Sequence, residues 1–272
     1  MLRTARFARS KMISTSRIDP ETPLLSAEAL SYSYDDLRIF ENLSFSLGEK
    51  SFLSLLGPSG CGKTTLLNLI AGFLKPTSGL MNFGGTPIAG PGPDRAMVFQ
   101  SGALFEWLTV RDNIEFSLRC LGTPIKERRE VSDEMVELVG LQGFEDKFIY
   151  QLSGGMRQRV GVARVIAAKP QIMLMDEPFA AVDVQTRENL QEELLRIHRR
   201  TGCTIIFVTH SIDEAVFLSD KVFLFSPRGL GKGGFRDIVD VELPDPRWDG
   251  KNRLHPQFLQ IREQLYVAMR EG

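Results

Sequence analysis

The nonapeptide GPSGCGKTT, residues 57–65, lies between the apolar run Phe52–Leu56 and a helical pattern that begins at Leu66. Small residues let successive backbone N–H groups converge on a phosphate, and the positive end of the following helix adds to the attraction. Lys63 would reach the β- and γ-phosphates, and the Thr64 hydroxyl would take one position on Mg²⁺. An ordinary glycine turn before a helix is the alternative. We expect a nucleoside triphosphatase whose phosphate loop consists of Gly57, Pro58, Ser59, Gly60, Cys61, Gly62, Lys63, Thr64 and Thr65.

The composition restricts the class of protein. With 272 residues, 43% of them hydrophobic, the chain can bury the core of one large domain with an inserted lobe. A formal net charge of -1 gives no whole-chain reason to expect nucleic acid as a partner. The longest apolar run, Leu66–Leu74, is far shorter than the roughly 20 residues that span a bilayer, so any membrane role must come through a partner. Three widely separated cysteines indicate reduced thiols in a cytosolic protein: Cys61, Cys120 and Cys203.

The first 23 residues differ in character from the rest of the chain. Residues 1–18 contain arginine and lysine but no acidic residue, as in a transit peptide. A disordered leader is the preferred interpretation, with Met12 as a possible true start of translation. We therefore expect residues 1–23 to be a disordered leader and the folded part to begin near Leu24.

Short apolar segments precede the phosphate loop. Leu25–Tyr34, Leu43–Leu47 and Phe52–Leu56 predict strands separated by turn residues, so the first part of the chain is expected to form an antiparallel flap. Tyr34 is placed at the end of the first strand, where its ring could stack on a purine. Tyr32 is the alternative, because it is expected on the same face.

A second strand and a helical region follow the loop. Arg95–Phe99 predicts a buried strand, and Gln100 follows it directly. A glutamine at this position could place its amide near the metal and the attacking water, whereas a solvated strand end is the alternative. Helical periods replace strands from residue 101 to 168, with Pro124 as a helix start and Gly140 as a stop. We expect this region to be an inserted helical lobe.

A second glycine-rich segment, QLSGGMRQR, occupies residues 151–159. Ser153 can cap a helix that runs to about Ala168. Its hydroxyl and the N–H groups of Gly154 and Gly155 would form a second anion site at a helix N-terminus. One chain with two such sites and one nucleotide suggests that the second site serves a neighbouring subunit. A capped helix behind a glycine loop is the alternative.

Two carboxylates end an apolar run, Ile172–Met175, of the kind found in strands buried on both faces. Neighbouring strand residues point to opposite sides of a sheet. Asp176 is therefore expected to face the Mg²⁺ ion, and Glu177 the water that attacks the γ-phosphate. A solvated acidic turn is the alternative.

The remaining chain continues the α/β alternation. Thr204–Thr209 predicts a core strand with His210 at its end, where parallel sheets place their chemistry, and Ser211–Glu214 predicts a capping box. Lys221–Phe225 predicts one more strand. The extension over residues 226–272 carries no obvious chemistry, and we expect it to pack on the core through one helix face that contains Phe258, Ile261 and Leu265.

Together, these segments resemble the ATP-binding subunit of ATP-binding-cassette (ABC) transporters over about residues 24–225. Met156 and Ala180 replace residues that are commoner in the family, and neither change removes a group assigned to phosphate. The family motifs fall at Gly57–Thr64 (Walker A), Gln100 (glutamine loop), Leu152–Met156 (signature), Asp176-Glu177 (end of Walker B), Asp183 (D loop) and His210 (histidine switch).

The resemblance implies an α/β fold: a P-loop NTPase core with a mixed, mostly parallel sheet, an antiparallel β flap and a helical subdomain at about residues 101–168. It implies an ATPase that uses ATP and Mg²⁺ and works as a head-to-tail dimer. In that dimer the phosphate loop of one subunit and Ser153, Gly154 and Gly155 of the other enclose each ATP, and Asp183 is a further residue expected to bind the nucleotide. Hydrolysis is assigned to Glu177, His210 and Gln100. The residues expected to hold the metal are Thr64, Gln100 and Asp176.

The same resemblance implies partners and a location. The second ATPase is another copy or a homologue, integral membrane permease subunits transmit the motion, a solute-binding receptor acts indirectly, and nucleic acid is not a partner. Such a subunit lies peripherally on the cytoplasmic face of the inner membrane. Four segments are similar to the nitrate, sulfonate and taurine importers: Gly90–Arg95, Asp176–Phe179, Thr186–Glu188 and Leu243–Arg247.

Other functions remain open at this stage. A soluble ABC ATPase that acts on DNA or ribosomes usually carries tandem cassettes or long coiled-coil insertions, whereas this chain shows one cassette and no sustained heptads. An exporter ATPase is a further alternative. A plain P-loop kinase is disfavoured by the signature segment.

Overall fold

Six strands form the central sheet of the structure, a computed structural model that describes residues 23–99, 103–180, 182–225 and 234–270. The strands lie in the order β10-β9-β3-β8-β7-β6. Neighbours from β9 to β6 are parallel, and β10 pairs antiparallel with β9 at one edge. This confirms the predicted mixed, mostly parallel sheet. Its strands are β3 (Phe52–Leu56), β6 (Arg95–Val98), β7 (Ile172–Asp176), β8 (Thr204–Thr209), β9 (Lys221–Phe225) and β10 (Phe235–Asp240).

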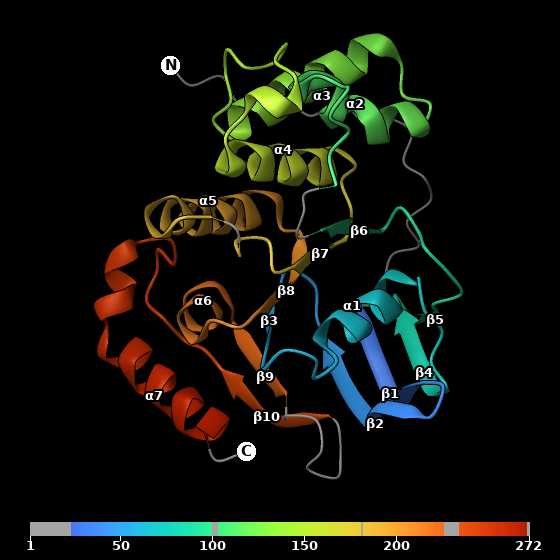
Figure 1. The fold of residues 1–272 in the computed structure, drawn as a ribbon, viewed down its shortest axis with the longest axis vertical. Helices are drawn as coiled ribbons and strands as arrows, with labels where there is room; N and C mark the ends of the chain where they lie inside the picture. The colour runs from blue at the N-terminus through green and yellow to red at the C-terminus, as the bar shows by residue number, and fades with distance from the viewer. Residues whose placement is uncertain (1–22, 100–102, 181, 226–233, 271–272) are drawn as a thin grey trace.

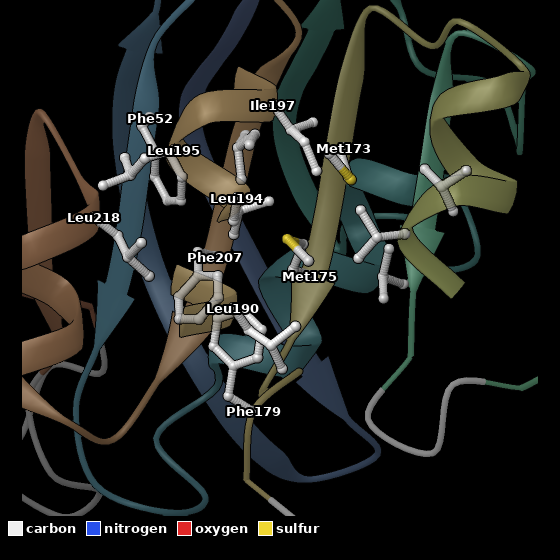
Figure 2. Close-up of a cluster of buried hydrophobic side chains, with 14 of the residues drawn as sticks. Phe52, Met173, Met175, Phe179, Leu190, Leu194, Leu195, Ile197, Phe207 and Leu218 are labelled. Atoms are coloured by element: carbon white, nitrogen blue, oxygen red, sulfur yellow. The ribbon is translucent and has the colours of Figure 1, made fainter. Parts of the chain in front are cut away.

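Both faces of the central strands are buried, which explains their continuous apolar runs. Side chains alternate between two hydrophobic clusters: Met175 of β7 belongs to one cluster, and its neighbour Leu174 belongs to the other. Figure 2 shows the first cluster, in which Met175 and Phe207 lie close to Leu190 and Leu194 of α5 (Val184–Thr201). The sheet is therefore fixed from both sides, and the chemistry is confined to the ends of its strands.

A smaller antiparallel sheet, in the order β2-β1-β4-β5, forms the predicted flap. Helix α1 (Lys63–Ala71) lies beside this flap and shares a buried cluster with it and with the central sheet (Figure 1). The expected start of the second strand at Leu43 is wrong, because a two-residue turn pairs Tyr34 with Leu37 and the ladder continues from there. The flap strands are β1 (Leu25–Tyr34), β2 (Leu37–Leu47), β4 (Ser78–Phe83) and β5 (Thr86–Pro87).

Helices α2, α3 and α4 form the predicted inserted lobe beyond the β6 edge of the sheet (Figure 1). Their bounds are Val110–Cys120, Ile125–Leu138 and Gly154–Ala167. Pro124 precedes the first residue of α3, and Gly140 takes a left-handed φ of 64° just after its end, as a helix stop requires. Helix α4 packs against α2 and also contacts β6 and α5, so it joins the lobe to the core.

The C-terminal helix α7 (Pro256–Arg270) lies beside α6 (Ile212–Leu218) on the α5 side of the sheet (Figure 1). It buries Phe258, Ile261 and Leu265. Within the described ranges, no helix has the length and apolar character needed to cross a bilayer. Most of the expected leader, residues 1–22, lies outside the described residues.

Candidate functional site

Three parallel strands of the central sheet end at the same edge. The register pairs Leu56 of β3 with Thr209 of β8, and Asp176 of β7 with Val208. Polar residues follow each strand end, where open α/β sheets place their ligands. The register therefore makes neighbours of three residues from distant parts of the sequence: Gly57, Glu177 and His210.

The glycine loop between β3 and α1 needs small residues to keep its shape. Gly62 has a φ of 107°, and a Cβ there would lie 2.7 Å from Cγ2 of Ile39 in the flap. No side chain caps α1, and its first turn contains no acidic residue. The N–H groups at this helix end are thus available to an anion, which fits the predicted phosphate site.

Lys63, the first residue of α1, is buried with 4% of its surface exposed. Its Nζ donates to the carbonyl oxygens of Gly57 and Pro58, each at 2.8 Å. Burial lowers the pKa of the lysine, whereas the charges of Cys61 and Glu177 act in the opposite direction. Within the described part of the chain, Lys63 forms no salt bridge. Nζ also lies 3.7 Å from Sγ of Cys61 and 3.4 Å from Nδ1 of His210. A buried ammonium group without a carboxylate partner among the described residues is suited to pairing with a bound anion.

Thr64 and Asp176 form a second contact at this edge. Oγ1 of Thr64 donates to Oδ1 of Asp176 at 3.1 Å. Burial raises the pKa of Asp176, the hydrogen bond from Thr64 lowers it, and the neighbouring charge of Glu177 raises it. Among the described residues, no group of three or more His, Cys, Asp or Glu side chains is placed to hold a metal ion. The hydroxyl of Thr64 and the carboxylate of Asp176 are oxygen ligands of the kind that Mg²⁺ takes together with phosphates and water.

His210 joins the three strand ends. Its Nε2 lies 2.5 Å from Oε1 of Glu177, and its Nδ1 lies 2.8 Å from the carbonyl oxygen of Gly57. Nζ of Lys63 also lies 3.4 Å from Nδ1, so the ring contacts the carboxylate, the loop carbonyl and the buried lysine together. The predicted general base and the predicted switch histidine are thus in direct contact.

Glu177 lies beyond the strand in which the sequence expectation placed it. The strand alternation assumed for Asp176 and Glu177 does not apply, because β7 ends at Asp176. Glu177 adopts a left-handed φ of 45°, and its N–H donates to the carbonyl oxygen of Val208 at 3.2 Å. A backbone turn rather than the strand pleat therefore separates the two carboxylates. Non-glycine residues in this conformation are uncommon and cluster at functional sites.

The two tyrosines of β1 differ in exposure. Tyr34 is 44% exposed, whereas Tyr32 is buried at 8%. The ladder between β1 and β2 shifts its register between Tyr32 and Ser33. The Tyr34 ring packs edge-on against Tyr32, with centroids 4.9 Å apart. Of the two rings, Tyr34 is the accessible one.

The signature residues lie on the helical lobe. Ser153 caps α4 by accepting a hydrogen bond from the N–H of Met156 at 3.3 Å, as predicted. A Cβ on Gly155 would lie 2.8 Å from Cγ2 of Thr186, so this glycine lets α4 approach the start of α5. Ser153 and Gly154 are exposed. None of their hydrogen bonds within the described residues reaches the glycine loop of the same chain.

Two further predicted residues complete the set. Asp183 caps α5 by accepting from the N–H of Thr186 at 3.0 Å, and this hydrogen bond lowers the pKa of the carboxylate. Gln100, predicted near the metal and the water, lies outside the described residues.

Sequence reasoning missed a buried polar group directly behind His210. It treated Glu214 only as part of a capping box. The cap is half formed: Oγ of Ser211 accepts from the N–H of Glu214 at 3.3 Å, but the Glu214 carboxylate turns to Thr209 and Gln191. Nothing in the sequence pattern indicates Gln191, since buried polar contacts between distant segments leave no periodic signal.

Residues 40–180 match the family described as ABC transporter. The chain belongs to this family. The ABC ATPase is 49% identical to the taurine import ATP-binding protein TauB of Pelagibacter ubique, over 86% of this chain and 89% of that protein. An uncharacterized ABC transporter ATP-binding protein of Methanocaldococcus jannaschii is 46% identical, over 86% of this chain and 85% of its own length.

Solved structures agree with this family assignment. The ABC ATPase is similar to cbiO1 of Clostridium perfringens, part of the ABC transporter complex cbiONQ, with a TM-score of 0.75 and 26% identity over 91% of this chain and 99% of that one. An ATP-binding cassette in a dimeric, post-hydrolysis structure with ADP and Pi gives a TM-score of 0.69 and 28% identity, over 80% and 99%. The predicted fold class is confirmed, and the protein is an ATP-binding ATPase.

Proposed function

We propose that this ABC ATPase hydrolyses Mg·ATP in a head-to-tail dimer and thereby energises the import of a small organic solute, taurine or a related sulfonate. The observation that carries the proposal is the convergence of Lys63, Asp176, Glu177 and His210 at the ends of β3, β7 and β8. A buried cation, a hydroxyl–carboxylate pair and a carboxylate–imidazole pair are the groups that phosphoryl transfer to water requires.

In this proposal the glycine loop and Lys63 hold the triphosphate, and the exposed ring of Tyr34 stacks on the purine. Thr64 and Asp176 are the described residues that would hold Mg²⁺, with Gln100 as the further predicted ligand. The ion would neutralise charge on the phosphate oxygens. The uncapped N-terminus of α1 and the 3.1 Å contact between Thr64 and Asp176 support these roles.

Glu177 is the proposed general base. Water attacks the γ-phosphorus, the bond from phosphorus to the oxygen of the leaving ADP breaks, and the proton of the water passes to the Glu177 carboxylate. Contact with His210 fixes one carboxylate oxygen and leaves the other for the water. His210 itself is then placed to contact the γ-phosphate by exchanging its bond to Gly57.

The position of the second anion site supports the proposed dimer. Ser153 and Gly154 are exposed at the N-terminus of α4, and Asp183 is exposed at the N-terminus of α5. We assign them to the ATP held by the phosphate loop of the opposing subunit, which is a second copy or a homologous ATPase. The dimeric cassette bound to ADP and Pi supports this arrangement.

Import requires membrane subunits. The printed names of the taurine import relatives support this direction and this class of solute. An exposed aromatic group on the helical lobe is a suitable contact for a permease: Trp107 is 73% exposed and Tyr150 is 61% exposed. A β-bridge between Thr109 and Phe148 joins the two segments that carry these rings. We place the protein peripherally on the cytoplasmic face of the inner membrane, with a solute-binding receptor as an indirect partner.

Uptake of radiolabelled taurine tests the proposal. The gene would be deleted in its own host and complemented with wild type, Lys63→Ala or Trp107→Glu. We expect only wild type to restore uptake, with Trp107→Glu keeping its ATPase activity in solution because it alters the permease contact and not the phosphate site. Taurine uptake that persists in the deletion strain would refute the assigned solute. Restoration by Lys63→Ala would refute the energising role.

A further inference from the structure

A buried hydrogen-bond chain begins at the two residues that flank His210. The hydroxyl of Thr209, which is 3% exposed, donates to Oε2 of Glu214 and accepts from the N–H of Ser211 at 3.0 Å. One carboxylate thus fixes the backbone immediately before and after the histidine. The direction of the His210 ring depends on this short segment.

Glu214 lies in α6 and is buried, with 8% of its surface exposed. Its Oε1 accepts from Nε2 of Gln191 at 3.1 Å and lies 3.9 Å from Nε of Arg187. Arg187 also donates to the carbonyl oxygen of Val182 at 2.8 Å, next to the D-loop residue Asp183. Burial raises the pKa of Glu214, so the charged form depends on these donors. The Glu214 carboxylate therefore contacts Thr209, which precedes the histidine, and Arg187, which binds the residue before the D loop.

The hydrogen-bond chain continues to the C-terminal segment. Oε1 of Gln191 accepts from Nη2 of Arg253 at 2.7 Å, and the Arg253 guanidinium lies over the Phe217 ring, with its carbon 3.6 Å from the centroid. The Gln191 amide cannot be reversed, because its nitrogen faces a carboxylate and its oxygen faces a guanidinium. Arg253 belongs to a short 3-10 helix, Gly250–Leu254, that precedes α7.

We propose that Glu214, Gln191 and Arg253 are positioning residues for His210, and that the C-terminal segment sets the rate of ATP hydrolysis through them. This inference rests on the role of His210 in the proposed function. The ring lies 2.5 Å from Glu177 and 2.8 Å from the Gly57 carbonyl that it exchanges for the γ-phosphate, so a small shift of its backbone would misplace it for both contacts. Loss of Arg253 frees the Gln191 amide to rotate, so that its nitrogen no longer donates to Glu214. The carboxylate that accepts from the Thr209 hydroxyl is then less firmly fixed.

Arg253→Met tests the inference, because methionine keeps an apolar stem over Phe217 and loses the donor to Gln191. Arg262→Met is the matched control. Arg262 also lies on the C-terminal segment and faces α6, at 3.8 Å from Asp213, but its side chain is exposed and takes no part in the hydrogen bonds that lead to Thr209. We expect kcat of Arg253→Met to fall about ten-fold with KM for ATP within about two-fold of wild type, as for a group that acts on the chemical step. Arg253→Lys should recover part of the rate, and the control should match wild type.

A double-mutant cycle separates positioning from general support of the fold. Arg253→Met would be combined with His210→Ala, and hydrolysis followed in single turnovers. We expect the double variant to hydrolyse ATP no more slowly than His210→Ala alone, because the hydrogen-bonded residues act only through the histidine. Equal losses from Arg253→Met in both backgrounds, or an unchanged kcat in the Arg253→Met and Arg253→Lys variants, would overturn the inference. Wild-type rates from His210→Ala alone would instead refute the proposed role of His210, and this inference with it.

Discussion

Nε2 of His210 lies 2.5 Å from Oε1 of Glu177. Through its other nitrogen, the same ring contacts the carbonyl oxygen of Gly57, which also accepts a hydrogen bond from Lys63. The histidine thus connects the carboxylate after β7 to the loop after β3. A γ-phosphate bound at the loop must compete with the Gly57 carbonyl for Lys63 and His210, so ATP binding and the arrangement of the general base are linked.

Asp176→Asn should stabilise the nucleotide-free protein at neutral pH. Burial raises the pKa of Asp176, so the folded state holds this proton more tightly than the unfolded chain, and ionisation costs folding free energy. Asparagine removes the charge and can still accept from Thr64. The melting temperature should exceed that of wild type at pH 7, and the gain should shrink as the pH falls towards the ordinary aspartate pKa of about 3.9.

Thermal unfolding between pH 5 and pH 8, without nucleotide, measures this effect. Asp36→Asn, at an exposed turn of the flap, is the control for a lost surface charge. A melting temperature of Asp176→Asn below that of wild type at pH 7 would contradict the account. It would mean that the carboxylate stabilises the fold by itself.

Tyr34→Ala should weaken ATP binding several-fold and leave turnover at saturating ATP nearly unchanged. Aromatic stacking contributes roughly 0.5–1.5 kcal/mol beyond the burial of area, and the exposed Tyr34 ring supplies it in our assignment. Tyr34→Phe keeps the ring and is the matched control. Titration with a fluorescent ATP analogue measures both affinities. Equal affinities of Tyr34→Ala and wild type would return Tyr34 to a purely structural role.

Ser153→Arg should block closure of the dimer and leave ATP binding at the phosphate loop nearly intact, because the added bulk faces the opposing subunit. Ser153→Ala is the control, since both variants lose the cap on α4, worth about 1 kcal/mol, and only arginine adds bulk. Sedimentation with ATP should show monomers for Ser153→Arg. If its ATP affinity fell as far as that of Lys63→Ala, the assignment of Ser153 to the opposing subunit would be wrong.

The fold was predictable where local pattern and burial agree. The buried run Ile172–Met175, the glycine loop and the cap at Ser153 each carry a local signal, and each has the predicted structure. Parallel strand ends also meet at one edge by topology, which made the meeting of Asp176 with the phosphate loop predictable.

Features that depend on backbone irregularity or on distant contacts were not predictable. The register shift between β1 and β2 leaves no periodic trace in the sequence, nor does the left-handed backbone of Glu177. The contact between Arg253 and Gln191 joins segments 62 residues apart. Such contacts emerge only when packing brings the C-terminal segment against α5 and α6.

Glu177→Gln tests the central claim most directly. Glutamine keeps the size and hydrogen-bonding reach of the side chain and loses the charge that accepts the proton from water, so ATP binding and the closed dimer should survive while hydrolysis is lost. Loss of the charge also relieves repulsion with the triphosphate, so the ATP-bound dimer should live longer than in wild type. His210→Ala should slow hydrolysis without this added stability.

The measurement is single-turnover hydrolysis of Mg·ATP beside size-exclusion chromatography of the same samples. We predict a stable ATP-bound dimer of Glu177→Gln with no hydrolysis. Hydrolysis by Glu177→Gln at nearly the wild-type rate would contradict the account.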